Sequence, residues 1–211
     1  MTDKPRLKLA VLSDYICPFC YIGYLRLEKL REHFELAVNW ALVEIHPDSP
    51  AEGKPVEELG YSKARLDGLM GTLAEMARAE GVELSPHTFT TNSRKALLLA
   101  EASKTLGADV FYHLHRRLFE SFLVEGRNIG DSAVLENLAE ECAVPREILE
   151  QAWNDPVYAQ RLQRNLAAAV HNGATGTPTF FIGDKRLSGA VSVDALMAAA
   201  QAALAAGQPA S

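Results

Sequence analysis

The sequence lacks the features that mark several classes of protein. Its 211 residues include three cysteines, too few for the disulfide framework that holds small secreted domains together. Its 21 Lys and Arg are outnumbered by 27 Asp and Glu, and the net charge of −6 argues against a nucleic-acid-binding surface. At about 150 residues per domain, this length favours one enlarged domain, or a domain with an insertion, over two full ones.

Long apolar runs are also missing. The longest uncharged run, residues 195–211, is rich in alanine and broken by Gly207 and Pro209, so it predicts an amphipathic helix and a short tail, with no membrane span. Residues 1–8 are not followed by an apolar core with a cleavage site, so we expect no signal peptide and a cytoplasmic protein. Disulfides in that compartment are usually transient and chemical.

Hydrophobic periodicity predicts an α/β fold in which both ends of the chain supply strands. The expected elements are a strand over 7–12, a helix with Pro18 in its first turn, a strand over 36–45, a helix over 156–171, strands over 177–182 and 185–187, and a helix over 193–206. Two parallel strands joined by a helix form a right-handed crossover. We therefore expect residues 1–55 and 154–211 to form one mixed sheet with flanking helices.

The middle of the chain has a different pattern. Residues 46–60 are rich in proline and glycine and read as a loop. The helical pattern then recurs five times, over 61–79, from 92 or 93 to 107, over 109–124, from 131 or 132, and from 145. Residues 56–153 are therefore predicted to be an all-helical insertion.

The strongest chemical signal is the sequence Cys17-Pro18-Phe19-Cys20, at the start of the first helix. Two thiols separated by two residues can close a disulfide with little rearrangement. The free N–H groups and the positive dipole end of a helix N-terminus stabilise a thiolate. We assign Cys17 as the attacking thiol and Cys20, one turn further in, as the resolving thiol that releases the mixed disulfide.

The residues around the pair leave alternatives open. Phe19 supplies neither charge nor a hydrogen-bond donor, so we expect a moderately stabilised Cys17 thiolate and a milder oxidant than a pair flanking a cation. A half zinc site is the alternative, but Cys142 is the only other cysteine and the histidines are scattered. Cys142 reads as a small buried residue, or else as a third redox-active thiol. Asp14 either caps the turn before the helix or accepts a proton from Cys20.

Thr177-Pro178, after a glycine-containing loop and before a strand, is the second signal. Combined with the cysteine pair, it resembles the DsbA-like branch of the thioredoxin superfamily. Residues 13–23 (SDYICPFCYIG) and 176–180 (GTPTF) are most similar to FrnE-type dithiol-disulfide oxidoreductases and isomerases, and the similarity covers nearly the whole chain. The resemblance implies a thioredoxin-like fold carrying a helical insertion.

The resemblance also implies roles for individual residues. Cys17 and Cys20 would be the redox pair, and Pro178 would be a cis-proline packed beside the Cys17 sulfur. Thr177 would offer backbone groups to an extended substrate segment. Two aromatic residues, Phe19 and Tyr21, are expected to supply apolar contacts to substrate, together with Tyr15.

We therefore expect thiol–disulfide exchange with protein or peptide substrates, an unknown partner for recycling, and no nucleic acid or membrane. The dithiol would be its own redox centre, with no metal, nucleotide or flavin and with glutathione as a possible co-substrate. Phe19 stands where the periplasmic relatives commonly have His, which favours a cytoplasmic reductase or isomerase.

Two other functions stay open. Glutathione-dependent isomerases and kappa-class-like transferases act on small molecules, have a similar fold and typically use Ser where Cys17 stands. A chaperone-like binding module with incidental cysteines is the third hypothesis.

Overall fold

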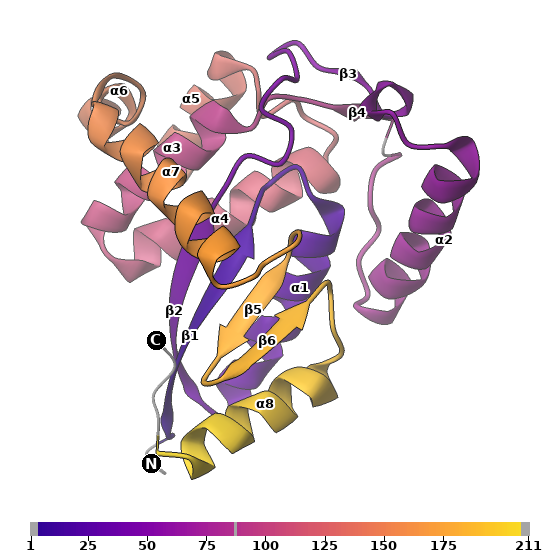
Figure 1. Ribbon diagram of the computed structural model, residues 1–211. Helices are drawn as coiled ribbons and strands as arrows, with labels where there is room; N and C mark the ends of the chain where they lie inside the picture. The colour runs from indigo at the N-terminus through magenta and orange to yellow at the C-terminus, as the bar shows by residue number, and fades with distance from the viewer. Residues whose placement is uncertain (1–3, 87, 208–211) are drawn as a thin grey trace. The chain divides into compact units, whose positions relative to one another are not determined.

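The computed structural model describes residues 4–86 and 88–207, which form two compact units (Figure 1). The first unit comprises Met1–Val43 and Asn165–Ser211, and the second comprises Glu44–Arg164. Both ends of the chain thus belong to one unit. The predicted insertion, 56–153, lies inside the second unit, whose bounds are wider.

A four-stranded mixed sheet forms the centre of the first unit. Its strands are β1 (Arg6–Ser13), β2 (Glu35–Leu42), β5 (Thr179–Ile182) and β6 (Lys185–Ser188), in the order β2-β1-β5-β6. Strand β2 is parallel to β1, whereas β5 is antiparallel to both β1 and β6. Every second residue of β1 from Leu7 on is buried on one face, and Val11 lies opposite the buried Phe180 of β5.

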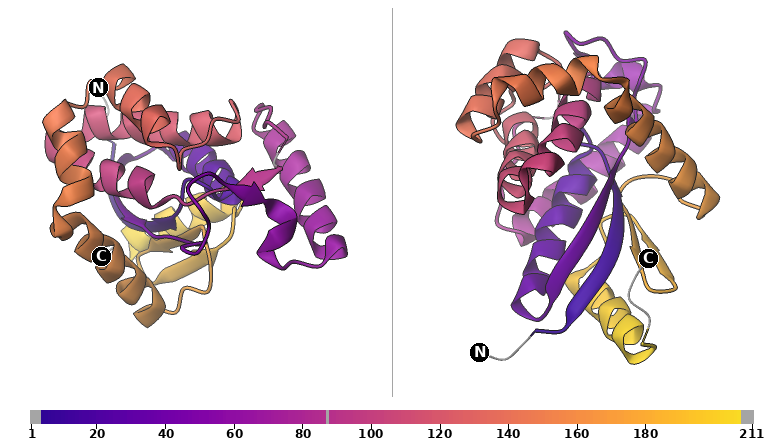
Figure 2. Two further views of the ribbon diagram at one scale, coloured as in Figure 1. Left: turned by 90° about the horizontal axis from the view of Figure 1, so that it is seen from above. Right: turned by 90° about the vertical axis from the view of Figure 1, so that its left-hand side faces the viewer.

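Two helices complete the framework around the sheet (Figure 2). Helix α1 (Pro18–Lys29) joins the two parallel strands through the short 3₁₀ helix η1 (Leu30–Glu32) and packs against Phe180. Helix α8 (Val193–Ala205) contacts both α1 and β5. The fold is therefore the predicted mixed sheet with flanking helices, and the β1-α1-β2 crossover places residues 13–20 at the carboxyl end of β1.

The second unit is mainly helical. Its elements are β3 (Lys54–Pro55), η2 (Val56–Leu59), α2 (Lys63–Ala79), β4 (Phe89–Thr90), α3 (Arg94–Ser103), η3 (Lys104–Leu106), α4 (Ala108–Leu123), α5 (Ser132–Glu141), α6 (Arg146–Asn154) and the first part of α7 (Pro156–His171). Helix α3 is buried from Ala96 to Ser103 and packs against α4 and α6. It forms the centre of this core.

Some details differ from the sequence-based expectations. The strand expected over 36–45 ends at Leu42. Strand β3 lies inside the stretch 46–60 that is expected to be a loop, and it pairs with β4 further along the chain. Strand β5 begins at Thr179 rather than at residue 177, since Pro178 has no N–H to donate to a strand partner. The tail expected after the last helix lies largely outside the described residues.

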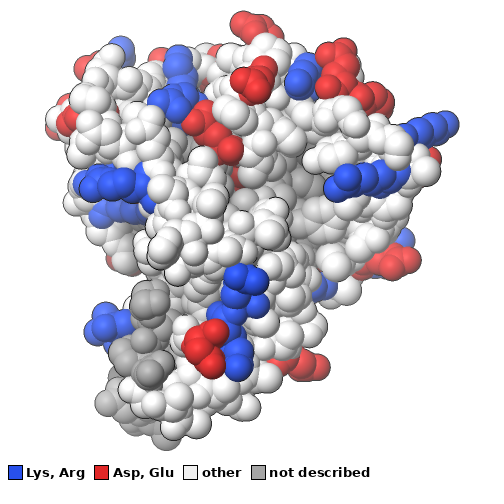
Figure 3. All heavy atoms as spheres, in the orientation of Figure 1, with Lys and Arg blue, Asp and Glu red and all other residues white. Residues whose placement is uncertain are grey.

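Two findings concern the surface and the helices as a whole. On the face shown in Figure 3, Lys and Arg are interspersed with Asp and Glu, with no extended patch of one sign. Across the described ranges, every helix is too short or too polar to cross a membrane.

Candidate active site

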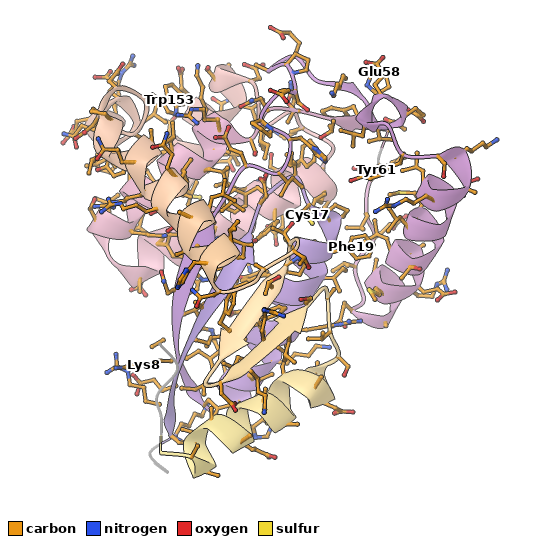
Figure 4. All side chains as sticks on the ribbon, viewed as in Figure 1. Lys8, Cys17, Phe19, Glu58, Tyr61 and Trp153 are labelled. Carbon is orange, nitrogen blue, oxygen red and sulfur yellow. The ribbon has the colours of Figure 1, made fainter. Side chains whose placement is uncertain are left out.

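The two cysteines of the Cys-Pro-Phe-Cys sequence occupy the start of α1, where Figure 4 labels Cys17 and Phe19. Cys17 is the N-cap residue, with an extended backbone (φ −90°, ψ 109°), and Pro18 is the first helical residue. The backbone N–H of Cys17 donates to the Asp14 carbonyl (3.2 Å), and that of Cys20 donates to the Cys17 carbonyl (2.9 Å). Both cysteines are therefore fixed within one tight turn, as the placement of Pro18 predicts.

Cys17 is the more acidic of the two thiols. Hydrogen bonds from the Cys20 side chain, the Thr177 side chain and the Cys20 backbone lower the pKa of Cys17 below the ordinary value for a thiol. Burial and the nearby Asp14 carboxylate oppose this shift. The strongest of these lowering interactions involve no positive charge, so hydrogen bonds stabilise the thiolate.

Cys20 is shifted the other way. Burial, the hydrogen bond to Cys17 and the charge of the Cys17 thiolate raise the pKa of Cys20 well above its ordinary value. The backbone of Asp14 and the side chain of Ser13 act in the opposite direction. Both cysteines are free thiols, so Cys17 is the one that loses its proton first as the pH rises, and Cys20 is the one that keeps its proton.

The loop before β5 completes the site. The Thr177–Pro178 peptide bond is cis, and the Cys17 Sγ lies 3.7 Å from the Thr177 carbonyl oxygen. Pro178 is buried, and its Cγ is 3.2 Å from the point where a Cβ on Gly23 of α1 would stand. The fold thus brings the Cys17–Cys20 pair together with Thr177 and Pro178, although Cys17 and Thr177 are 160 residues apart in the chain.

The aromatic residues expected to contact substrate differ in exposure. Phe19 is half-buried, whereas Tyr21 is 3% exposed and stacks on Tyr24 with ring centroids 6.4 Å apart. Tyr15 is fully buried. Phe19 therefore has the most surface left for a substrate, and the contact role of Tyr21 stays a prediction.

Asp14 and Cys142 are the two residues whose roles the sequence leaves open. The Asp14 side chain is fully buried and its Oδ1 accepts a hydrogen bond from the Ile16 N–H (3.4 Å), so it does cap the turn before α1. Cys142 follows α5 in the second unit and is 2% exposed, and burial raises its pKa to about 11. Burial therefore keeps this thiol protonated at neutral pH and limits its reactivity.

Two features of the site carried no assigned role in the sequence. Ser13, at the end of β1, interacts with Cys20, and Gly23 gives the Pro178 loop its close approach to α1. Both lie within residues 13–23, but the amino-acid sequence alone does not indicate which groups they contact. In the described part of the chain, no three His, Cys, Asp or Glu residues gather as metal ligands would.

Comparison with known proteins identifies relatives of this arrangement. A curated relative, the uncharacterized protein YwbO of Bacillus subtilis (strain 168), is 30% identical over 194 residues, covering 88% of this chain and 92% of its own length. Among solved structures, the probable DsbA oxidoreductase SCO1869 from Streptomyces coelicolor matches with a TM-score of 0.83 at 23% identity, covering 95% of this chain and 91% of that one.

Two further structures share the fold. A 2-hydroxychromene-2-carboxylate isomerase matches with a TM-score of 0.76 at 21% identity, covering 95% of this chain and 98% of that one. The cytosolic disulfide reductase DsbM from Pseudomonas aeruginosa, solved with GSH, matches with a TM-score of 0.67 at 18% identity, with the same coverage of each chain.

A dithiol at the N-terminus of a helix, on a mixed sheet and beside a cis-proline, defines the thioredoxin-like class of redox proteins. The model of one family within that class, the DSBA-like thioredoxin domain, matches residues 8–201. The chain therefore belongs to this family of thiol–disulfide oxidoreductases.

Proposed function

We propose that the protein is a thiol–disulfide oxidoreductase and isomerase that acts on disulfides of protein substrates through Cys17 and Cys20. The observation that carries this proposal is the opposite shift of the two thiol pKa values within one helical turn. A pair that shares one proton in this way has a nucleophile and a separate, protonated resolving group. Such a pair needs no metal, nucleotide or flavin.

The reaction proceeds in two exchanges. The Cys17 thiolate attacks one sulfur of a substrate disulfide, forming a Cys17–substrate bond while the other substrate sulfur leaves as a thiolate and takes up a proton. Cys20 then loses its proton and attacks the Cys17 sulfur, which forms the Cys17–Cys20 disulfide and releases the second substrate thiolate. Two electrons pass from the dithiol to the substrate, and without the second exchange the mixed disulfide can instead be shuffled.

The loop at Thr177 supports a polypeptide substrate. The Thr177 carbonyl lies against the Cys17 sulfur and precedes the first residue of β5. An extended segment can therefore align with this loop as an added strand while its cystine reaches Cys17. Phe19, half-buried at the same turn, offers apolar contact to such a segment.

The absence of a cation among the strongest interactions that stabilise the Cys17 thiolate favours a reductase or isomerase over a strong oxidase. We place this activity in the cytoplasm, where DsbM is described as a cytosolic disulfide reductase. Because DsbM was solved with GSH, we propose glutathione, or another thiol of that class, as the reductant that regenerates the dithiol.

The second candidate is an isomerase or transferase that uses glutathione on small molecules, favoured by the fold shared with 2-hydroxychromene-2-carboxylate isomerase. Cys20 distinguishes the two functions. A small-molecule isomerase retains its activity in Cys20→Ser, whereas net reduction of a disulfide is lost because the mixed disulfide cannot be resolved internally.

The direct test is insulin reduction with glutathione as electron donor. We expect activity in the wild type, none in Cys17→Ser, and loss of turnover in Cys20→Ser with a substrate mixed disulfide trapped on Cys17. Cys142→Ala is the matched control, because it removes a buried thiol outside the pair, and it should retain activity. Equal activity in Cys17→Ser and the wild type would reject the proposal.

A further inference from the structure

Ser13 occupies an unusual position for a polar residue. It is the last residue of β1, lies opposite Leu42 of β2 and is 1% exposed. Its carbonyl accepts a hydrogen bond from the Val43 N–H (3.0 Å). Strand alternation places its side chain on the same face as Val11, the face on which α1 packs.

The Ser13 hydroxyl is buried beside Cys20 without a well-formed hydrogen bond. Within the described residues, its Oγ is buried and has no N, O or S atom at hydrogen-bonding geometry. A buried hydroxyl in this state costs free energy, so such groups need an explanation. The group that Ser13 faces is Cys20, itself 1% exposed in the first turn of α1.

Resting on the proposed function, we propose that Ser13 is a positioning residue for the second exchange, in which its hydroxyl donates a hydrogen bond to the Cys20 thiolate. Cys20 is the attacking group only in that exchange, and it must first lose its proton inside a buried site. The Ser13 hydroxyl has no competing acceptor, so it can turn toward the sulfur when the negative charge forms. Hydrogen bonds to charged groups are the strong ones.

The hydrogen bond from Ser13 does not change the electron balance of the second exchange. The Cys20 proton leaves for solvent or a basic group, the Cys20 sulfur bonds to the Cys17 sulfur, and the Cys17–substrate bond breaks with its electron pair on the substrate thiolate. Ser13 keeps its own proton throughout. It lowers the free energy of the anion before the attack, as does the backbone of Asp14, the residue that follows β1.

The charged groups around Cys20 give the direction of the effect. The Cys17 sulfur raises the pKa of Cys20 while it is a thiolate, but in the mixed disulfide Cys17 carries no charge. The Asp14 carboxylate, whose charge raises the pKa of Cys17, is present in every variant. Removing the Ser13 hydroxyl therefore raises the pKa of Cys20 in the mixed disulfide and slows resolution at neutral pH.

The two exchanges can be timed separately with 5,5′-dithiobis(2-nitrobenzoate) in a stopped-flow instrument. The first equivalent of coloured thiolate reports attack by Cys17, and the second reports resolution by Cys20. In Ser13→Ala we expect an unchanged first phase and a second phase about tenfold slower at pH 7, the size given by one charged hydrogen bond. Its pH profile should move to higher pH.

Two further variants separate this role from packing. Ser13→Thr keeps the hydroxyl and should keep the pH profile of the second phase. Ser49→Ala removes another buried, unpartnered serine hydroxyl, in the second unit, and should change neither phase. A second phase that keeps its rate and pH profile in Ser13→Ala would overturn the inference, and so would a shifted profile in Ser13→Thr.

The outcome for Ser13 is distinct from the outcome for the proposed function. Failure of the proposed function appears in the wild type, as a missing reduction of insulin. If the wild type reduces insulin and both phases are slowed equally in Ser13→Ala, the redox pair stands and the role of Ser13 in resolution is rejected.

Discussion

At the scale of single residues, the difference between Cys17 and Cys20 comes from which one lies at the end of the helix. Cys17 is the N-cap residue and Cys20 is inside the first turn, so hydrogen bonds converge on the first sulfur and burial dominates at the second. The chemistry of the site therefore follows from a spacing of three residues.

Alkylation tests this difference. Iodoacetamide at pH 7 should modify Cys17 first and leave Cys20 and Cys142 largely unmodified, because only the pKa of Cys17 is lowered. The rate should fall as the pH drops through the Cys17 pKa, below the ordinary range of a thiol. Peptide mass spectrometry locates the label, and faster labelling of Cys20 would contradict the assignment.

We predict that the side chain at position 19, between the cysteines, tunes the stability of the Cys17 thiolate. In Phe19→His, a partly protonated imidazole next to Cys17 should lower the pKa of that thiol and make the disulfide more oxidising. The expected result is a several-fold faster reaction with iodoacetamide at pH 6, with Phe19→Leu as the uncharged control. Equal rates in the two variants would show that position 19 does not tune the thiolate.

The sequence was most informative at this scale. Cys17, Cys20 and Pro178 could be predicted because their chemistry is tied to residue type and spacing. Ser13 could not, because a serine is informative only once its hydroxyl is known to face a thiol. The exposure of Phe19 against the burial of Tyr21 also depends on packing that the letters do not contain.

At the scale of elements, the contact between α1 and the loop before β5 fixes the site. Gly23 permits it, since a Cβ there would stand 3.0 Å from Phe180 Cζ and 3.2 Å from Pro178 Cγ. In Gly23→Ala, a gain of about 1 kcal/mol in helix preference is outweighed by overpacking of about 1–3 kcal/mol. We expect a lower free energy of unfolding, by about 1 kcal/mol, and slower insulin reduction.

Urea unfolding checks this prediction against a matched helical glycine. At Gly71 of α2, a Cβ would meet no atom within 4 Å apart from its chain neighbours and its own helix backbone, so Gly71→Ala should raise the free energy of unfolding by up to about 1 kcal/mol. If both substitutions stabilise the protein, the close contact of Gly23 with Phe180 and Pro178 does not exist.

Long periodic elements could be predicted and short ones could not. Helices such as α4 and α8, and the strands β1 and β2, are long enough for their buried apolar residues to form a recognisable pattern in the sequence. Strands β3 and β4 are two residues long and pair across more than 30 residues, so no period marks them. They exist because of tertiary pairing, not local preference.

At the scale of the whole molecule, the stability of the second unit should depend on pH through His115. This residue of α4 is fully buried among Phe111, Tyr112 and Phe119, and burial together with the Lys104 charge lowers its pKa well below the usual value. Below about pH 6.5 the unfolded chain binds a proton at His115 that the folded chain does not. Stability is therefore lost as the pH falls, at about 1.4 kcal/mol per pH unit.

Urea unfolding at pH 7.5 and pH 5.5 measures this loss. His115→Phe fits the same aromatic surroundings without a titrating group, so its stability should fall less over this range, by about 1.4 kcal/mol for the full pH unit below 6.5. Identical pH dependence in the wild type and the variant would show that His115 is not the source.

The central claim, that Cys17 and Cys20 form one reversible redox couple of moderate potential, is tested most directly by equilibration in glutathione buffers. The account predicts a single two-electron transition, a disulfide that peptide mapping assigns to Cys17 and Cys20, and a potential between those of thioredoxin (about −270 mV) and protein disulfide isomerase (about −180 mV). A potential near that of a strong oxidase (about −120 mV), or no disulfide between these two residues, would contradict it.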